Sequence, residues 1–413
     1  MKFLFIFFFS CCALISYAQQ PTVPQTTQEN RALQHRNLVK SIEKNLSLPL
    51  SDSTEEQWMD AFYAMELTGY KSLWADRKIK MAAGSLQQRS NYFQFALIEL
   101  LHTNYKKIYA AEIAELLKAT NDPKCFAYGV QYLLAENPGA LLNEALMGNL
   151  MRLFNNDNNN VYASQVMLGF VNRMMKDAPP DHAGLLKNLL PGEVVMVSFQ
   201  RKNRDQPGLV LIREMNGQWL KNEDTIFWRP QLARSLGNMP FYLTNGNTPQ
   251  GLFRINGFDV SKSLAIGPTP NIQLMLPQEA TPAYFLKDSA YKDSSWTQTV
   301  YEKLLPAAFR NDQNLWETFI AGQAGRNEII AHGTTVDPAF YKGQPYYPHT
   351  PTLGCLCTKE IWSPENGKRL ESDQQQLVDA LKKAKGENGY CLVIELDDQQ
   401  KPVSIEDLVH LLR

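Results

Sequence analysis

Apolar residues recur at helical spacing through the first half of the chain. Trp58, Phe62 and Met65 lie on one potential helix face, and Phe93 and Leu97 lie on another. Residues three or four positions apart share one side of a helix, so both stretches predict amphipathic helices. We expect about five to eight helices before residue 190, packed pairwise as a bundle or a short α-solenoid.

The pattern changes near Pro191, where short β-branched or apolar runs alternate with turn residues and predict strands. Asn216-Gly217 predicts a tight hairpin. Ser372 and Gln375 predict the start of a helix that ends before Gly386, and a last short helix is expected near the C-terminus. The predicted strands are 194–197, 208–212, 241–244, 251–255, 272–276, 328–331 and 390–395.

These patterns predict an α+β protein with two domains. The first, 19–190, is all-helical. The second, 191–413, is mostly β with helical insertions. The residues of the helical domain indicate no chemistry of their own, so it is interpreted as a structural domain or as a contact for a protein partner.

The first eighteen residues have the layout of an export signal. Lys2 precedes a run of apolar residues, and Ala18 stands before polar sequence. This predicts a signal peptide, 1–18, and an exported mature protein, periplasmic or secreted. A retained anchor and a lipoprotein form, suggested by Cys11 and Cys12, fit the pattern less well. The mature chain contains no second stretch long enough to span a bilayer.

Charge and cysteine content narrow the classes of partner. Lys and Arg number 41 and Asp and Glu number 42, mixed along the chain, so nothing predicts nucleic-acid binding. Four cysteines follow the predicted signal peptide, too few for a disulfide scaffold of this length: Cys125, Cys355, Cys357 and Cys391. We expect at least one to be a free thiol and Cys125 to be a buried helix residue.

A histidine and a cysteine form the main candidate for chemistry. His332 follows a predicted strand and precedes Gly333, and Cys355 follows Gly354. A thiol attacks as thiolate, which a nearby imidazole generates by taking the proton. A glycine turn also aims backbone N–H groups at the oxygen of an attacked carbonyl, and Thr352 is placed to donate a hydrogen bond within that turn. The pair predicts acyl transfer.

Three blocks of residues resemble the catalytic domain of the L,D-transpeptidase family of the YkuD type. They are Thr248-Pro249-Gln250-Gly251-Leu252-Phe253, His332-Gly333 and Thr352-Leu353-Gly354-Cys355-Leu356. The resemblance covers 191–393 and none of the helical half. Leu353 stands where the family has a histidine, Cys357 stands where it has Arg or Asn, and the gap between His332 and Cys355 is slightly longer than usual.

The resemblance implies a mechanism on peptidoglycan stem peptides. Cys355 would attack the carbonyl between the third and fourth residues of a stem tetrapeptide, and His332 would act as base and then as acid. The carbonyl of Gly333 would orient the imidazole. The N–H groups of Leu353, Gly354 and Cys355 would hold the oxyanion. The resemblance implies no cofactor and no metal.

Other residues are candidates for substrate binding or for a lid. Thr352, Arg254 and His349 are candidates to contact the substrate. The insert 337–351 is a possible lid over the peptide, with Tyr346 and Tyr347 facing the substrate. Its aromatic residues, including Phe340 and Tyr341, have an alternative role in packing the insert onto the domain.

Several alternatives stay open. Water in place of an acceptor amine gives an L,D-carboxypeptidase. The departures at Leu353 and Cys357 also fit a catalytically silent relative that binds the cell wall. A third class is a zinc-stabilised module using His332, His349, Cys355 and Cys357. A disulfide from Cys357 to Cys391 would leave Cys355 free, whereas one from Cys355 to Cys357 would silence the site.

Overall fold

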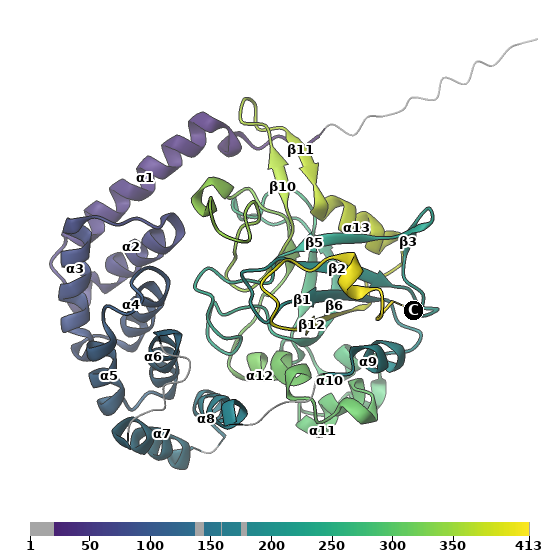
Figure 1. Cartoon of the computed structure of the whole chain (residues 1–413), viewed down its shortest axis with the longest axis horizontal. Helices are drawn as coiled ribbons and strands as arrows, with labels where there is room; N and C mark the ends of the chain where they lie inside the picture. The colour runs from purple at the N-terminus through teal and green to yellow at the C-terminus, as the bar shows by residue number, and fades with distance from the viewer. Residues whose placement is uncertain (1–19, 137–143, 158, 175–179, 413) are drawn as a thin grey trace, which may run out of the picture.

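The structure is a computed structural model that describes residues 20–136, 144–157, 159–174 and 180–412. The predicted signal peptide, 1–18, lies outside the described residues. The predicted α+β class is confirmed, because a helical region is followed by a region built on a large sheet (Figure 1). Within the described residues, no helix combines the length and apolar character needed to cross a bilayer.

Nine α-helices precede Pro191 in the described part of the chain, one more than the largest number predicted. The first eight follow one another in an arc beside the sheet (Figure 1), and we call them the helical arc. The helices are α1 (Gln28–Ser47), α2 (Glu55–Thr68), α3 (Leu73–Gly84), α4 (Asn91–Asn104), α5 (Ala110–Ala119), α6 (Pro123–Glu136), α7 (Glu144–Asn156), α8 (Val161–Met174) and α9 (His182–Asn188).

The arc is held by the apolar faces that the sequence predicts. Trp58 and Phe62 of α2 are fully buried. The ring of Phe62 meets that of Phe93 from α4 edge to face, with centroids 5.3 Å apart. The Ser90 hydroxyl accepts the Phe93 N–H at 3.3 Å and so caps the start of α4. Cys125 is fully buried in α6, as predicted.

The main sheet has eight strands in the order β5-β2-β1-β12-β6-β7-β8-β9. Strands β1 and β12 run parallel, as do β8 and β9, and the other neighbours are antiparallel. These strands are β1 (Val195–Gln200), β2 (Gly208–Arg213), β5 (Trp228–Gln231), β6 (Gly251–Asp259), β7 (Asn271–Met275), β8 (Ala331–His332), β9 (Leu356–Cys357) and β12 (Tyr390–Glu395). Small pairs are formed by β3 (Lys221–Asn222) with β4 (Thr225–Ile226), and by β10 (Glu360–Trp362) with β11 (Arg369–Ser372).

Both faces of this sheet are covered, which is why β1 is buried along its whole length. Helix α13 (Asp373–Lys383) covers one face, and the Ser372 hydroxyl caps it through the Gln375 N–H at 2.9 Å. The other face is covered by α9, α10 (Pro282–Leu286), α12 (Glu317–Gln323) and α14 (Ile405–Leu408), with α11 (Gln298–Tyr301) beside them (Figure 1).

The two edges of the sheet meet. The chain leaving β5 reaches β9, where Leu232 and Cys357 exchange both backbone hydrogen bonds at 2.8 Å. Just beyond, the Leu236 N–H donates to the Thr352 carbonyl at 2.7 Å. The sheet is therefore nearly closed, and the Gly-Cys turn lies at the seam.

Two predicted strands differ from the structure. The predicted strand 241–244 is wrong, because Tyr242 and Leu243 leave the sheet and join the core of the helical arc. The predicted strand 328–331 is reduced to β8, since Glu328 takes a left-handed conformation at φ +55°. Both segments lie beside the candidate site, and in both the backbone departs from a regular strand.

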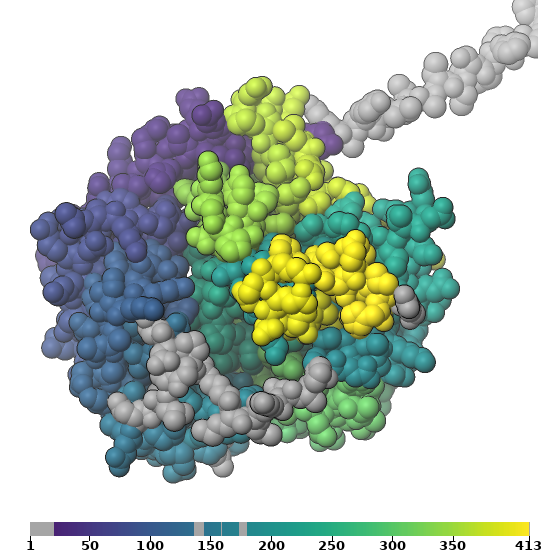
Figure 2. Space-filling view, viewed as in Figure 1, coloured from purple at the N-terminus to yellow at the C-terminus, as the bar shows by residue number. Residues whose placement is uncertain are grey.

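The contacts between the helical arc and the sheet region include two lines of backbone contact. The residues before α1 meet the segment after β10, where the Val23 N–H donates to the Gly367 carbonyl at 2.8 Å. Figure 2 shows the purple N-terminal region and the lime region adjoining at the top of the molecule. The second line runs along residues 235–248, which we call the bridging loop. There His102 bonds the Gly237 carbonyl at 3.0 Å, and the Tyr128 hydroxyl donates to the Thr244 carbonyl at 2.8 Å.

Candidate active site

The candidate residues lie on or just before two neighbouring short strands. Parallel pairing of β8 with β9 sets Ala331 opposite Leu356 and His332 opposite Cys357. Cys355 comes immediately before β9, beside Ile330. We call residues 326–333 and 352–357 the site edge.

The ring of His332 is oriented by a backbone hydrogen bond. Its ring is buried, and Nδ1 lies 2.5 Å from the carbonyl oxygen of Gly333. A carbonyl only accepts, so Nδ1 carries the proton and Nε2 is left as an acceptor. Burial lowers the pKa of His332, although the bond to Gly333 opposes this change. A side chain at Gly333 would collide with Glu360, because its Cβ would lie 2.3 Å from Oε2.

Cys355 is half-buried and its sulfur has two backbone neighbours. The Ile330 N–H donates to Sγ at 3.5 Å, and Sγ lies 3.7 Å from the Glu328 carbonyl. Burial raises the pKa of the Cys355 thiol, whereas the Ile330 N–H and the charge of Arg326 lower it. The sulfur therefore has two groups that favour its anion.

The turn before Cys355 requires glycine. Gly354 has φ +117°, and a Cβ there would lie 2.1 Å from Nη2 of Arg326. Thr352 closes the turn as predicted, since its hydroxyl donates to the Cys355 carbonyl at 2.9 Å. Thr248, from the first block of the family resemblance, donates to the Gly354 carbonyl at 2.9 Å. All three blocks thus meet in space.

The N–H groups expected to form an oxyanion hole are not equivalent. The Gly354 N–H donates to the Thr352 hydroxyl at 3.0 Å, so the expectation for Gly354 needs correction. The N–H groups of Leu353 and Cys355 have no hydrogen-bond partner in the described part of the chain. These two, on either side of Gly354, are the available donors.

The ring of His332 makes no hydrogen bond to Cys355 among the described residues. The two residues are instead related through the strand pair, in which Ile330 bonds Cys355 and His332 faces Cys357. Base and thiol hydrogen bonds are often long in an enzyme without its substrate and tighten in the complex. The arrangement therefore places His332 on β8 and Cys355 at the residue just before the neighbouring β9.

Arg254 and Tyr346 lie in other surroundings. The guanidinium of Arg254 is buried, donates to the carbonyls of Asn388 and Gly389 and packs against Tyr390. Tyr346 is buried beside Tyr341. Both side chains are committed to packing, so we remove them from the set of substrate-binding candidates.

The insert 337–351 packs onto the protein through most of its aromatic residues. The ring of Phe340 lies 5.7 Å from that of His35 in α1, and Tyr341 is buried. Tyr347 is half exposed, and together with His349 it lines a cavity of about 440 Å³ beside β2 and β5. The packing role therefore holds for Phe340 and Tyr341 but not for Tyr347.

All four described cysteines are free thiols, so neither proposed disulfide is present. Burial raises the pKa of Cys357 to about 12, which keeps it protonated. No group of three His, Cys, Asp or Glu side chains that could hold a metal ion occurs among the described residues. Cys355 is thus the thiol best placed to react at this edge.

Arg326 is the site residue that the sequence analysis missed. It follows α12 without any recognisable motif, and its approach to Gly354 depends on the folding of the whole domain. In the sequence, Arg326 is only a charged residue near the start of a predicted strand, and such residues are common on protein surfaces.

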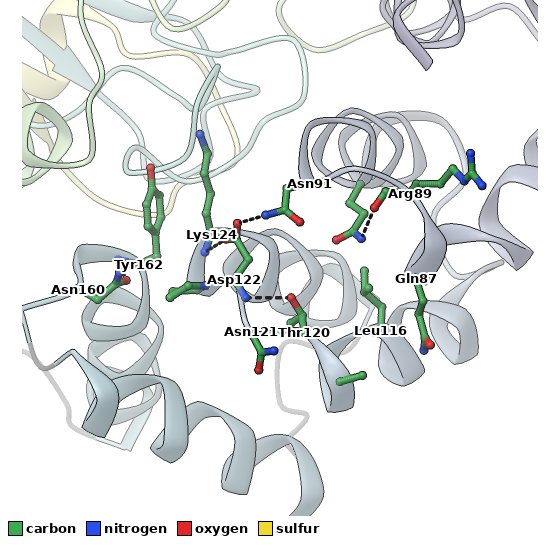
Figure 3. A pocket seen from close by; sticks show the side chains of 13 residues that line it. Gln87, Arg89, Asn91, Leu116, Thr120, Asn121, Asp122, Lys124, Asn160 and Tyr162 are labelled. Carbon is green, nitrogen blue, oxygen red and sulfur yellow. Dashed lines mark hydrogen bonds between the residues drawn. The ribbon is translucent and has the colours of Figure 1, made fainter. Parts of the chain in front are cut away.

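The helical arc contains a separate polar cavity of about 770 Å³ at the start of α6 (Figure 3). Asp122 accepts a hydrogen bond from Asn91 at 2.6 Å on its wall, and Lys124 and Tyr162 point toward the sheet region. The Tyr162 hydroxyl reaches the Ala324 carbonyl at 2.8 Å, close in sequence to Arg326. The lining of this cavity includes neither Cys355 nor His332.

Comparisons with protein-family models, with curated proteins and with solved structures found no match to this chain.

Proposed function

We propose that this protein is an exported cysteine acyltransferase of the L,D-transpeptidase type that acts on peptidoglycan stem peptides. The observation that supports this most is the state of His332. Its Nδ1 is fixed by the Gly333 carbonyl, which leaves Nε2 as a base on the strand beside Cys355. This is the role that the family resemblance implies for the Gly333 carbonyl.

The mechanism begins with transfer of the Cys355 thiol proton to Nε2 of His332. Sγ then attacks the carbonyl carbon between the third and fourth stem residues. The N–H groups of Leu353 and Cys355 donate to the oxyanion. The C–N bond breaks, His332 returns its proton to the leaving amine, and a thioester remains on Cys355. An amine of a second stem releases the acyl group and forms the cross-link; water in its place gives carboxypeptidase activity.

A carbapenem tests the nucleophile directly, because its strained lactam acylates this kind of thiol. We expect one covalent adduct by intact mass, lost in Cys355→Ala and kept in Cys357→Ala. His332→Ala should slow its formation by about 10²-fold or more, the usual contribution of a general base. If neither a carbapenem nor a simple alkylating agent labels Cys355 under reducing conditions, the proposal fails.

A silent wall-binding relative is the second candidate. Two observations favour it: the burial that raises the pKa of Cys355 and the missing bond from His332 to the thiol. In that case the protein would sediment with purified peptidoglycan, Cys355→Ala would sediment equally well, and no product would form from a stem tetrapeptide.

A further inference from the structure

Arg326 is a buried cation whose hydrogen-bond partners are all neutral. Nη1 donates to the Asn247 carbonyl at 2.8 Å and also to that of Phe241, and Nη2 donates to the Gly246 carbonyl at 2.9 Å. The residue as a whole is 7% exposed. Within the described residues, no carboxylate lies within ion-pair distance of it.

The guanidinium is pressed against the turn that presents Cys355. A Cβ at Gly354 would lie 2.1 Å from Nη2, so any side chain at that position would displace the guanidinium. From Arg326 the chain runs on to Glu328 and Ile330, whose backbone groups flank Sγ. The arginine and the sulfur are thus held by one short segment and one turn.

A buried charge without a counter-charge is costly, so the identity of its anionic partner matters. The ionisable groups nearest to Arg326 are Cys355, Tyr128 and Glu317. Burial raises the pKa of Glu317 to about 8 and that of Tyr128 well above its ordinary value, so neither is mainly charged near pH 7. Glu328 is a further charged group near the thiol, and it disfavours the thiolate. Burial raises the pKa of the Cys355 thiol as well, so the charge of Arg326 acts against that burial and favours the thiolate when it forms.

We propose that Arg326 is a positioning residue that fixes the Gly354 turn and stabilises the Cys355 thiolate as it forms. The proposal rests on the proposed function and names how that site is activated. The thiolate then gains a stabilising charge from Arg326 in addition to that of the imidazolium formed when His332 takes the thiol proton. The thiol proton passes to Nε2 of His332 or to solvent, and no other reactant is required.

The pH dependence of Cys355 alkylation tests this. Iodoacetamide is applied to the full mature chain from pH 5 to 10, and peptide mapping separates Cys355 from the three buried cysteines. Relative to wild type, Arg326→Gln should shift the midpoint upward by about one pH unit and slow alkylation at pH 7 about tenfold, the size of effect expected from one lost opposite charge. Arg326→Lys keeps the charge and should recover most of the rate.

Arg254→Gln is the matched control, because Arg254 is also a buried arginine bonded to backbone carbonyls, and its midpoint should equal that of wild type. Glu328→Gln should move the midpoint in the opposite direction. A purely structural role for Arg326 would change the amount of reactive protein but not the midpoint. If Arg326→Gln does not fold, Arg326→Met replaces it, since methionine keeps an unbranched apolar stem and removes the charge.

An unchanged midpoint in the folded variant, Arg326→Gln or its replacement Arg326→Met, overturns the inference. This outcome is distinct from failure of the proposed function, because alkylation requires no peptidoglycan. A shifted midpoint without a carbapenem adduct would instead support the inference about Arg326 and overturn the proposed acyltransferase function.

Discussion

The helical arc and the site edge are stabilised in different ways. The arc consists of regular helices whose apolar faces form one continuous core around Trp58, Phe62 and Phe93. The site edge has little regular structure, with two strands of two residues each. It is held instead by backbone carbonyls bonded to Arg326 and by the hydroxyls of Thr248 and Thr352.

The bridging loop joins these two regions. Its Tyr242 and Leu243 belong to the core of the arc, while its Gly246 and Asn247 carbonyls accept hydrogen bonds from Arg326. The arc is thus part of the support of the site, although it contributes no residue to the chemistry. We infer that its packing determines where the guanidinium lies relative to Cys355.

The largest expected effect comes from removing a core ring of the arc. Phe93→Ala should lower the free energy of unfolding by about 3–5 kcal/mol, since the side chain is fully buried and leaves a cavity. Urea unfolding followed by tryptophan fluorescence measures this. Leu73→Ala, at a position 83% exposed, should change it by less than about 0.5 kcal/mol. Equal losses of unfolding free energy in both variants would contradict the claim that Phe93 is a core position and Leu73 is not.

A pH effect on stability should arise next, from two neighbouring buried carboxyls, of which Glu99 contacts the bridging loop. Burial raises the pKa of Glu99 from 4.5 to about 7, and Glu66 beside it is also raised. The folded state then binds more protons than the unfolded state, so stability falls as pH rises from about 4.5 to about 7. Burial lowers the pKa of His102 from 6.5 to about 4. The folded state then binds fewer protons than the unfolded state in this range, so His102 makes stability fall as pH falls from 6.5 to about 4.

Urea unfolding at pH 5 and pH 8 measures this effect. Glu99→Gln should show a smaller loss of stability between the two values than wild type. Glu56→Gln, on the exposed side of α2, should behave as wild type does. A loss of the same size in Glu99→Gln would rule out the buried carboxyl as its source.

A smaller change is expected when the Thr352 hydroxyl is removed. Thr352→Val loses one hydrogen bond accepted from Gly354 and one donated to Cys355, and should cost about 1–2 kcal/mol of stability. The carbapenem adduct should form more slowly, because the turn is less fixed. Thr352→Ser retains both bonds and should match wild type in both assays; a slow adduct in the serine variant would point to the methyl group instead.

The smallest effect tests the link between the regions. Tyr128→Phe removes the hydrogen bond to the Thr244 carbonyl and should cost about 0.5–1.5 kcal/mol. If the bridging loop transmits arc packing to Arg326, alkylation of Cys355 should also slow in this variant. Tyr92→Phe, at an exposed position of α4, serves as the control. Altered stability with unaltered alkylation would show that the loop isolates the site from the arc.

Periodicity predicted the arc and most of the sheet because those segments bury the faces that their local pattern indicates. It failed for 241–244, where Tyr242 and Leu243 are apolar but are buried against another region. No local pattern distinguishes those two destinations. The shortening of the predicted strand before His332 has a similar origin, because the left-handed Glu328 places its carbonyl beside Sγ.

The site was predictable in its named residues but not in its electrostatics. His332, Gly333 and the Gly354 turn were indicated by residue type and order. The occupied N–H of Gly354 depends on the rotamer of Thr352, and the nearby cation depends on Arg326, far from Cys355 in sequence. Long-range contacts of this kind become visible only when the whole domain has folded.

The exchange of hydrogen bonds between Leu232 and Cys357 has a consequence for the behaviour of the protein in concentrated solution. Unpaired strand edges recruit other chains and begin aggregation. Here the chain beyond one outer strand is bonded to the opposite outer strand, and Pro230 in β5 removes one more donor from that side. We therefore expect a folded sheet that offers little backbone for strand addition, and one whose tendency to aggregate rises when the bonds across this seam are broken.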